Sequence, residues 1–316
     1  MSNDRKISVA IATYNRAHII PETLGCILGQ AYPPSEIVIV DDGSSDGTRE
    51  AIEAVSKDIV YIKIENCGPG TALKKAIERC SNEWIALCDD DDRWRPEHLS
   101  RRVRLLDAYP EVDYTFSNFS SFGPDSRPNY DAFADIPPGW MKSFPKPDAD
   151  GFQDLGHDLL GPFLRNNPVF PTSTCFSREL YERCGGIDPQ FSRLGCWDAH
   201  LTWRFVLHGR VACDHRITVE TRRHGGSFSR KKSRVYTQRA EMLRQAWRDG
   251  WIPPKYGSDI EQAIVDSNIE AAQWAWNEKD HRYFREIASK SSIRTFPRAL
   301  QLRLIYSWLM SLSPRA

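Results

Sequence analysis

The sequence has no long apolar run and no paired cysteines. No stretch approaches the roughly 18 consecutive apolar residues typical of a membrane-spanning helix, so we expect no segment to cross a bilayer. Its eight cysteines include no Cys-x-x-Cys pair, which argues against a zinc site or a disulfide framework and favours reduced thiols in a cytosolic protein. The chain starts with only a short apolar run, so we expect no signal peptide.

The sequence also lacks net charge, because 42 Lys and Arg residues balance 42 Asp and Glu residues. This balance argues against a nucleic-acid-binding protein held mainly by phosphate contacts. The charges are unevenly spread: residues 221–316 hold 18 basic and 9 acidic residues, and residues 1–220 hold 24 and 33. A basic tail on an acidic part is compatible with a metal-using enzyme that rests on an anionic surface. Pairing of the two parts with each other is an equally simple explanation.

Short β-branched runs alternate with amphipathic segments over the first hundred residues. This alternation predicts a parallel sheet with crossover helices, which is an α/β fold of the Rossmann type. The expected strands are 7–12, 36–40, 59–64 and a run that ends at 88, and the expected helices are 19–30, 47–57 and 71–80.

Polar residues follow three of these strands where each strand ends. They are Thr13 and Tyr14, then Asp41 and Asp42, and finally the run of four aspartates at 89–92. Ligands of open α/β sheets bind beyond the carboxyl ends of the strands, so we expect all three segments to line one crevice.

The aspartate run 89–92 is the most informative of the three segments. Two carboxylates about 4 Å apart repel by roughly 4 kcal/mol at an effective dielectric constant near 20, so a crowded group needs a cation to offset it. A divalent metal that carries an anionic ligand would supply this charge. An isolated run of this kind is more often a solvated acidic turn, and only the convergence of the three strand ends favours the metal.

The rest of the chain suggests a second, helical part. Residues 117–171 are rich in Pro, Gly, Asp and aromatics and predict a long irregular excursion, either a lid or an acceptor-binding loop. A helix is expected from about Trp197, and after about residue 230 the pattern becomes helical and basic. We therefore expect a catalytic domain over 1–228 and a basic helical extension over 229–316, with no internal repeats.

Four segments together resemble a known family: 8–16 (SVAIATYNR), 36–48 (EIVIVDDGSSDGT), 87–96 (LCDDDDRWRP) and 185–188 (GGID). Their order and spacing are similar to those of the inverting family 2 glycosyltransferases, which have the GT-A fold. The resemblance covers roughly residues 5–228. It implies a nucleotide-sugar donor, usually a UDP- or dTDP-sugar, and a divalent cation.

The resemblance assigns the donor side of the site to the first two segments. Thr13 and Tyr14 would contact the nucleoside, with Arg16 of the same motif also on the donor side, and Asp42 would bind the base. Many relatives have Arg-Asn after the segment that corresponds to 66–72, whereas this chain has Leu-Lys. A donor contact is therefore either missing or made by Lys74 or its neighbour Lys75, and we assign it to Lys74.

The aspartate run would supply the ribose and metal contacts. The resemblance implies Asp89 for the ribose, Asp91 for the metal, and Asp92 as a neighbouring metal ligand or a supporting group. Four identical residues leave this register open by one position. Hard oxygen ligands suit Mg²⁺ or Mn²⁺, which would neutralise the departing diphosphate.

An inverting transfer also needs a general base for the acceptor hydroxyl. Family members take it from a Glu-Asp pair at the start of a helix, where this chain has Trp197 and Asp198. Asp198 is therefore the expected base, although a carboxylate in the first turn of a helix also has a simple structural explanation. For His200, on the same helix, we favour a structural role.

A basic loop at 222–224 resembles the family loop that closes over the diphosphate. Within it we assign Arg223 to the donor and His224 to the metal. Taken alone, such a run is more often a solvated loop.

The last segment, 296–312, carries an apolar stripe. The stripe favours packing on the enzyme's own domain or on another subunit as a homo-oligomer, and peripheral membrane contact is the other interpretation. Its members are Leu300, Leu304, Ile305, Trp308, Leu309 and Leu312.

We therefore predict a metal-dependent inverting glycosyltransferase that transfers a sugar to a saccharide or lipid-linked glycan. It would act in cell-surface polysaccharide or glycoconjugate assembly, in the cytoplasm or at the inner face of the membrane. One alternative is a catalytically silent nucleotide-sugar-binding module. The Trp197 that replaces the usual Glu of the family favours this alternative. A haloacid-dehalogenase-like phosphatase ranks lower, because Asp46-Gly-Thr lies several residues too far from the strand for a nucleophile motif.

Overall fold

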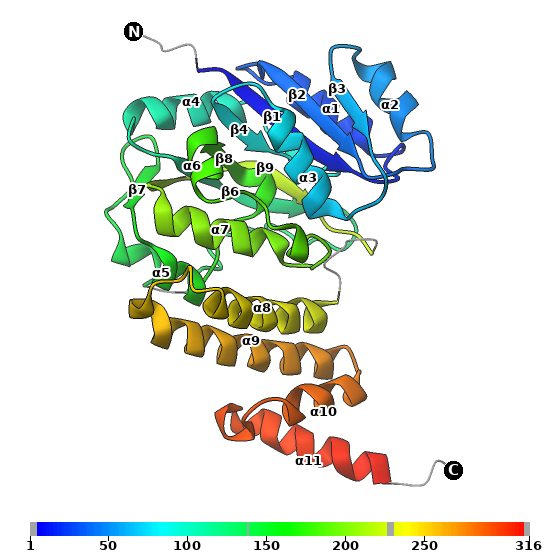
Figure 1. The fold of residues 1–316 in the computed structure, drawn as a ribbon, viewed down its shortest axis with the longest axis vertical. Coiled ribbons are helices and arrows are strands. Elements are labelled where there is room, and N and C mark those ends of the chain that lie inside the picture. The colour runs from blue at the N-terminus through cyan, green and yellow to red at the C-terminus, as the bar shows by residue number, and fades with distance from the viewer. Residues whose placement is uncertain (1–4, 138, 226–230, 313–316) are drawn as a thin grey trace. The chain divides into compact units, whose positions relative to one another are not determined.

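The computed structural model describes residues 5–137, 139–225 and 231–312, without the side chains of 309–312 (Figure 1). The chain divides into two compact units. The first comprises residues 1–193 and 197–225, and the second comprises 194–196 and 226–316. The domain boundary predicted after residue 228 lies outside the described residues.

The first unit is built on a mixed sheet whose amino-terminal half is parallel, as predicted. Its strand order is β3-β2-β1-β4, and α1, α2 and α3 connect the strands. The strands are β1 (Ile7–Thr13), β2 (Glu36–Asp41), β3 (Val60–Lys63) and β4 (Trp84–Leu87), and the helices are α1 (Ile20–Leu28), α2 (Thr48–Val55) and α3 (Pro69–Arg79).

Alternate residues of the central strands pack into two different cores, one on each face of the sheet. On β1, Ala10 belongs to one core, whereas Val9 and Ile11 belong to the other. Both faces are therefore buried, which explains why β1 and β2 are almost continuously apolar. Their polar residues gather at the strand ends as a result.

The other half of the sheet is mostly antiparallel. β8 pairs with β4, β6 pairs with β8 and runs parallel to β9, and β5 and β7 each pair with β9. The strands are β5 (Arg93–Trp94), β6 (Tyr114–Phe122), β7 (Phe152–Gly156), β8 (Thr174–Ser177) and β9 (Val211–Arg222). The helices beside them are α4 (His98–Ala108), α5 (Leu160–Arg165), α6 (Arg178–Arg183) and α7 (Trp197–His208).

The stretch 117–171 holds more regular structure than the sequence indicated. It contributes the end of β6, all of β7 and α5. Within its described residues 123–151, the only helix is the short 3-10 turn Met141–Ser143. The irregular excursion is thus confined to the middle of the predicted range, because β6 and β7 form strands by pairing with the distant β9.

Two arginines of α4 are buried beside β9, with one carboxylate of that strand between them. Asp214 of β9 accepts hydrogen bonds of 2.7 Å from Arg101 and Arg102 of α4, and one of 3.0 Å from the backbone N–H of Arg216. The three charged side chains are at most 2% exposed. His98 lies on the same helix, stacked on Trp94 with ring centroids 4.4 Å apart.

The second unit is helical, which confirms the predicted C-terminal helical extension. α8 packs on α9, α9 on α10, and α10 on α11. These helices are α8 (Lys232–Arg248), α9 (Gly257–Asn277), α10 (His281–Ser289) and α11 (Arg298–Leu312). Within the described ranges, no helix is both long enough and apolar enough to cross a membrane.

Candidate active site

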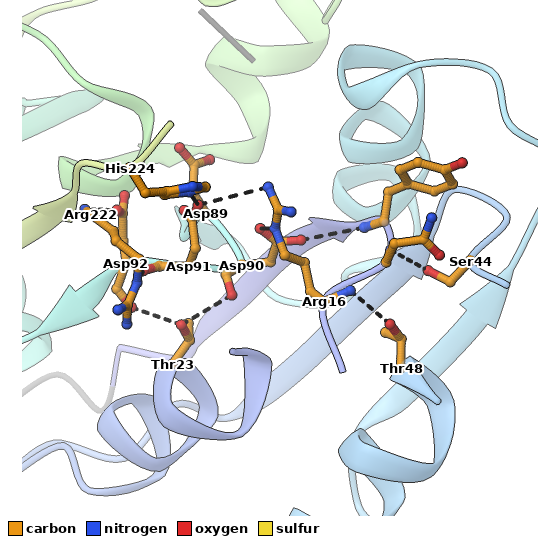
Figure 2. A network of polar contacts seen from close by, with 12 residues as sticks. Arg16, Thr23, Ser44, Thr48, Asp89, Asp90, Asp91, Asp92, Arg222 and His224 are labelled. Atoms are coloured by element: carbon orange, nitrogen blue, oxygen red, sulfur yellow. Dashed lines mark hydrogen bonds and ion pairs between the residues drawn. The ribbon is translucent and has the colours of Figure 1, made fainter. Parts of the chain in front are cut away.

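The loop after β1 lies against the aspartate run after β4. The Asp90 carboxylate accepts a hydrogen bond of 3.4 Å from the Tyr14 backbone N–H and one of 3.3 Å from Arg16 Nε. Arg16 Nη2 also lies 3.9 Å from the Asp91 carboxylate. Figure 2 shows Arg16 between the aspartates and the loop that carries Ser44. The structure therefore brings these donor-side residues beside the aspartate run.

The same loop is joined to the loop after β2. Asn15 donates its backbone N–H to Ser44 Oγ (2.8 Å), and its side-chain oxygen accepts from the backbone N–H of Ser45 (2.8 Å). The backbone N–H of Arg16 donates to Thr48 Oγ1 at 2.9 Å. Asn15 has a φ of 53°, in the left-handed region that asparagine tolerates better than most residues. These contacts fix the position of Arg16, and sequence reasoning did not identify them.

Asp42, the predicted base-binding residue, is 3% exposed and already holds a loop. Its carboxylate accepts from the backbone N–H groups of Cys67 (2.7 Å) and Gly68 (2.9 Å), and the Cys67 thiol lies 3.4 Å away. Gly68 has a φ of 98°, and a Cβ there would lie 2.7 Å from a side-chain carbon of Arg193. Asp42 thus fixes the start of α3, and its contact with a nucleobase stays a prediction.

Lys74, the predicted substitute for the missing donor contact, forms an ion pair of 3.3 Å with Glu78 on the exposed side of α3. The charge of Lys75 instead lowers the pKa of Cys67, a thiol whose pKa is raised overall, first of all by burial. The donor contact predicted for Lys74 stays a prediction.

Asp91 and His224 meet as the sequence interpretation required. Asp91 Oδ2 lies 3.0 Å from His224 Nε2. Figure 2 shows the imidazole of His224 next to the aspartate run. These two side chains come from loops 133 positions apart in the sequence, and their role as metal ligands stays a prediction.

Asp92 is buried and has partners for both carboxylate oxygens. Oδ2 accepts from the Thr172 hydroxyl at 2.6 Å, and Oδ1 accepts from the backbone N–H of Arg222 at 2.8 Å. The Thr172 hydroxyl in turn accepts from the backbone N–H of Asp89 at 2.9 Å. These contacts support the run, and the metal-ligand role predicted for Asp92 stays a prediction.

Arg222 is a site residue that the sequence analysis passed over in favour of its neighbours. Its Nε donates to the Asp91 backbone carbonyl at 2.8 Å, and its Nη2 bonds Glu22 at 2.7 Å. Its guanidinium also lies 4.4 Å from the centre of the Phe122 ring. Arg223 lies instead 5.4 Å from the Phe170 ring, and its charge partly opposes the rise in the pKa of Asp92 that burial causes.

A threonine of α1 fixes the backbone of the run from the other side. The Thr23 hydroxyl lies 3.2 Å from the carbonyl oxygen of Asp90 and 2.9 Å from that of Asp92 (Figure 2). Thr23 and Thr172 therefore hold the run between them. Neither residue has a local sequence pattern that marks it as part of a site.

The electrostatics of the run show that its carboxylates are not fully neutralised by the protein. Burial, followed by the charges of the neighbouring aspartates, raises the pKa of Asp89 well above its usual range. Burial also raises the pKa of Asp90 to about 6, although Arg16 opposes the shift, and the pKa of Asp92 to about 7. A cation in this crevice would favour the charged forms of all three groups.

The donor set fits a divalent cation completed by a ligand. Within the described ranges, no group of three or more His, Cys, Asp and Glu side chains is arranged to hold a metal by itself. Mg²⁺ sites, however, commonly use one or two carboxylates, several waters and the phosphates of the substrate. Asp91, with His224 beside it, provides such an incomplete set, in keeping with the excess negative charge around it.

The predicted base, Asp198, stands in the first turn of α7. Its charge contributes to the raised pKa of Asp89, so the two carboxyl groups are within electrostatic reach of each other. Asp198 also lines a small cavity together with Leu87 at the end of β4, Tyr114 and Trp197. His200, two residues further on, is buried with its ring 4.7 Å from that of Phe191, which supports the structural role favoured for it.

Comparisons with known proteins identify the family of this chain. Residues 8–164 match the family model "Glycosyl transferase family 2". The chain is 30% identical over 297 residues to an uncharacterized glycosyltransferase of Nostoc sp., a match that covers 89% of this chain and 86% of that protein.

The chain belongs to glycosyltransferase family 2.

A second relative matches only in part. TuaG of Bacillus subtilis, named for teichuronic acid biosynthesis, is 32% identical over 127 residues, which is 39% of this chain and 50% of that protein.

Solved structures of low sequence identity confirm the GT-A fold that the sequence predicted. S. aureus TarS in complex with UDP-GlcNAc superposes with a TM-score of 0.62 at 16% identity, covering 96% of this chain and 87% of that one. The mannosyltransferase PcManGT from Pyrobaculum calidifontis, in complex with GDP-Man and Mn²⁺, gives 0.58 at 21% identity, covering 98% and 81%.

Proposed function

We propose that this family 2 glycosyltransferase transfers a sugar, with inversion, from a nucleoside-diphosphate sugar to a hydroxyl of a saccharide or lipid-linked glycan. The observation that carries the proposal is the position of Asp198, which lines one cavity with Leu87, the last residue of β4, and whose charge contributes to the raised pKa of Asp89. Strands β1, β2 and β4, whose ends carry the polar segments, are neighbours in one sheet. An inverting reaction needs a base on one side of the sugar and stabilisation of the leaving group on the other.

In the proposed mechanism, Asp198 accepts the proton of the acceptor hydroxyl. The acceptor oxygen forms a bond to the anomeric carbon, and the bond from that carbon to the diphosphate oxygen breaks. Arg223 and Arg16 are the cations on the donor side, where negative charge grows on the leaving diphosphate. Tyr14, which is 48% exposed, is accessible to the nucleoside.

Mg²⁺ or Mn²⁺ fits this crevice and would be held by Asp91 and His224. When bound, such an ion would supply Lewis-acid stabilisation of the leaving diphosphate. Thr13, Asp42 and Asp89 complete the proposed donor side, with Asp89 assigned to the ribose. The relation to PcManGT, which was solved with GDP-Man and Mn²⁺, supports both the donor class and the cation.

We also propose the place of the reaction in the cell and along the chain. Residues 1–228 would carry out the transfer, with the middle of 117–171 on the acceptor side and 229–316 as an extension. Cell-surface polysaccharide or glycoconjugate assembly is the proposed pathway, in the cytoplasm or at the inner membrane face. The name of the partial relative TuaG supports this pathway.

The test is nucleoside-diphosphate release from UDP-, dTDP- and GDP-sugars, with Mn²⁺, with Mg²⁺ and with EDTA. We expect release to depend on one donor, on the metal and on an added glycan acceptor. Asp198→Asn should lower the rate of transfer about 100-fold or more while donor binding, measured by thermal shift, is retained. Substantial residual transfer by this variant would exclude Asp198 as the base.

The same assay tests the binding-module alternative. A silent module would be stabilised by a nucleotide sugar and Mn²⁺ without releasing diphosphate for any acceptor. The phosphatase alternative has lost its support, because Asp46 holds the start of α2: its carboxylate accepts from the backbone N–H groups of Thr48 (3.1 Å) and Ala17 (3.2 Å).

A further inference from the structure

Helix α11 carries apolar residues on two sides, and only one side is covered. Leu300 and Leu304 are buried in the core of the second unit at 2% and 6% exposed. On the other side, Leu302 is 67% exposed, Ile305 58% and Tyr306 54%. The predicted single stripe is therefore split: Leu300 and Leu304 are buried, whereas Ile305 is 58% exposed and Trp308 is 53% exposed, with its ring 5.4 Å from the Arg285 guanidinium.

The exposed face is held in place by the covered one. Arg285 of α10 donates to both the backbone carbonyl (3.0 Å) and the hydroxyl (2.8 Å) of Ser307. Tyr306 also contacts Trp276 of α9, with ring centroids 6.1 Å apart. α11 is thus docked on its own unit, and this contact fixes the orientation of the helix and of its exposed residues.

α11 is also the last helix of a series in which each helix packs on the one before it (Figure 1). Leu302, Ile305, Tyr306 and Trp308 of this helix are each more than half exposed, so α11 presents an apolar surface of the kind that is buried against something else.

Charge identifies the occupant. After Glu286 the sequence contains no acidic residue, whereas it contains Lys290 and four arginines, at 294, 298, 303 and 315. Arg294 and Arg298 are exposed beside the apolar face. A second copy of the chain would bring the same positive charges together, whereas an anionic bilayer complements them and also accepts Leu, Ile, Tyr and Trp side chains at its interface.

We propose that the outer face of α11 lies in the interface of an anionic lipid bilayer, as a peripheral contact of the second unit. Leu302 and Ile305 enter the boundary between headgroups and acyl chains. Trp308 and Tyr306, each with an apolar ring and a polar atom, lie at headgroup level, and Arg294 and Arg298 contact lipid phosphates. This role is separate from the transfer reaction, because it requires neither donor nor metal.

The experiment is co-sedimentation of the full chain with vesicles of phosphatidylcholine alone and with about 30% phosphatidylglycerol. We expect binding to the anionic vesicles only, weakened by raising the salt concentration. Leu302→Ser with Ile305→Ser should weaken this binding at least about tenfold, since each buried aliphatic side chain contributes to partitioning. Arg298→Glu should weaken it as well, without changing the melting temperature.

Leu28→Ser is the matched control, because Leu28 is a 43% exposed leucine at the end of α1 in the other unit. It should bind vesicles like the unchanged protein. Absence of vesicle binding, or equal binding to both lipid compositions, would overturn the proposal. So would a concentration-dependent dimer in light scattering that Leu302→Ser with Ile305→Ser abolishes, since a second copy would then be the partner.

Discussion

The first unit contains two buried groups of charge that differ in how they are neutralised. Behind the sheet, Asp214 accepts hydrogen bonds from both Arg101 and Arg102, so each charge lies against an opposite one. At the strand ends, four carboxylates at 89–92 lie side by side, with the Arg16 guanidinium as the nearby cation on one side. The first group pairs within the chain, whereas the second keeps an excess of negative charge that protonation or a bound cation can offset.

The two groups also respond to pH in opposite directions. Asp90 and Asp92 have raised pKa values of about 6 and about 7, so without metal they contribute stability that declines as pH rises from about 4 to 7. Beside the arginines, burial lowers the pKa of His98 well below its usual value. Its contribution therefore declines as pH falls below about 6.5. The buried ion pairs and the crowded carboxylates can thus be separated by experiment.

Removal of the carboxylate behind the sheet should have the largest effect on stability. Asp214→Asn leaves two buried guanidinium groups without a counter-charge, which should lower the free energy of unfolding by about 3 to 5 kcal/mol. Urea denaturation measures it. Asp154→Asn is the control, because Asp154 pairs with the half-exposed Arg210 at 2.6 Å and should cost at most about 1 kcal/mol. Equal losses in the free energy of unfolding for the two substitutions would contradict a special stabilising role of the buried Asp214.

Removal of a carboxylate from the aspartate run should act in the opposite sense. Asp91→Asn should abolish about 99% or more of the transfer activity. In EDTA at neutral pH, it should leave the melting temperature unchanged or raised, because the charge of Asp91 raises the pKa values of Asp89 and Asp92. Asp58→Asn, at an exposed carboxylate, should change neither property. A large drop in melting temperature for Asp91→Asn would show that the run is structural.

A smaller effect is expected from the threonine that supports the run. Thr172→Val keeps the shape but removes the hydroxyl between Asp92 and the Asp89 backbone, so the apparent affinity for Mn²⁺ should fall about tenfold. Activity measured against Mn²⁺ concentration checks this. Thr174→Val is the control, since its buried hydroxyl bonds the Pro171 carbonyl and not an aspartate. The same fall in both variants would point to general loosening of this segment.

The smallest effect should come from the histidine beside the arginines. His98→Gln removes the group whose native pKa is lowered, so the stability of this variant should fall less steeply than that of the unchanged protein between about pH 6.5 and 5.5. The difference should be at most about 1.4 kcal/mol over that unit of pH. Urea denaturation at several pH values measures it, and parallel pH profiles would show that His98 does not titrate on unfolding.

The sequence predicts the parallel half of the fold and the positions of its strand ends, because these depend on local patterns. β1, β2 and β4 are short apolar runs, and their polar residues can only follow them. The antiparallel half is harder to predict: β6 alternates aromatic residues with Ser, Thr and Asn, and β7 becomes a strand by pairing with β9, about 60 positions away. Composition alone therefore predicts loops for these two segments, whereas pairing with the distant β9 makes them strands.

The site also combines residues that local motifs predict with residues that depend on long-range contacts. Asp91 and His224 stand in recognisable motifs, but Thr23, Thr172 and Arg222 act through contacts 69 to 131 positions away in the sequence. No local pattern marks such partners. Asp42 shows that a local motif can also be incomplete. Its motif predicts a ligand contact, but the structure shows that its carboxylate accepts hydrogen bonds from the backbone N–H groups of Cys67 and Gly68.

The position of Cys67 beside Asp42 makes it a natural attachment point for a fluorescent reporter. Of the eight cysteines, six are buried, and only Cys26 and Cys67 are partly exposed. A Cys26→Ser protein would therefore present one accessible thiol to a maleimide dye, next to the proposed nucleobase contact. Because burial raises the pKa of this thiol, labelling needs mildly alkaline buffer. Nucleotide binding would then be read as a change in emission, without a radioactive donor or a known acceptor.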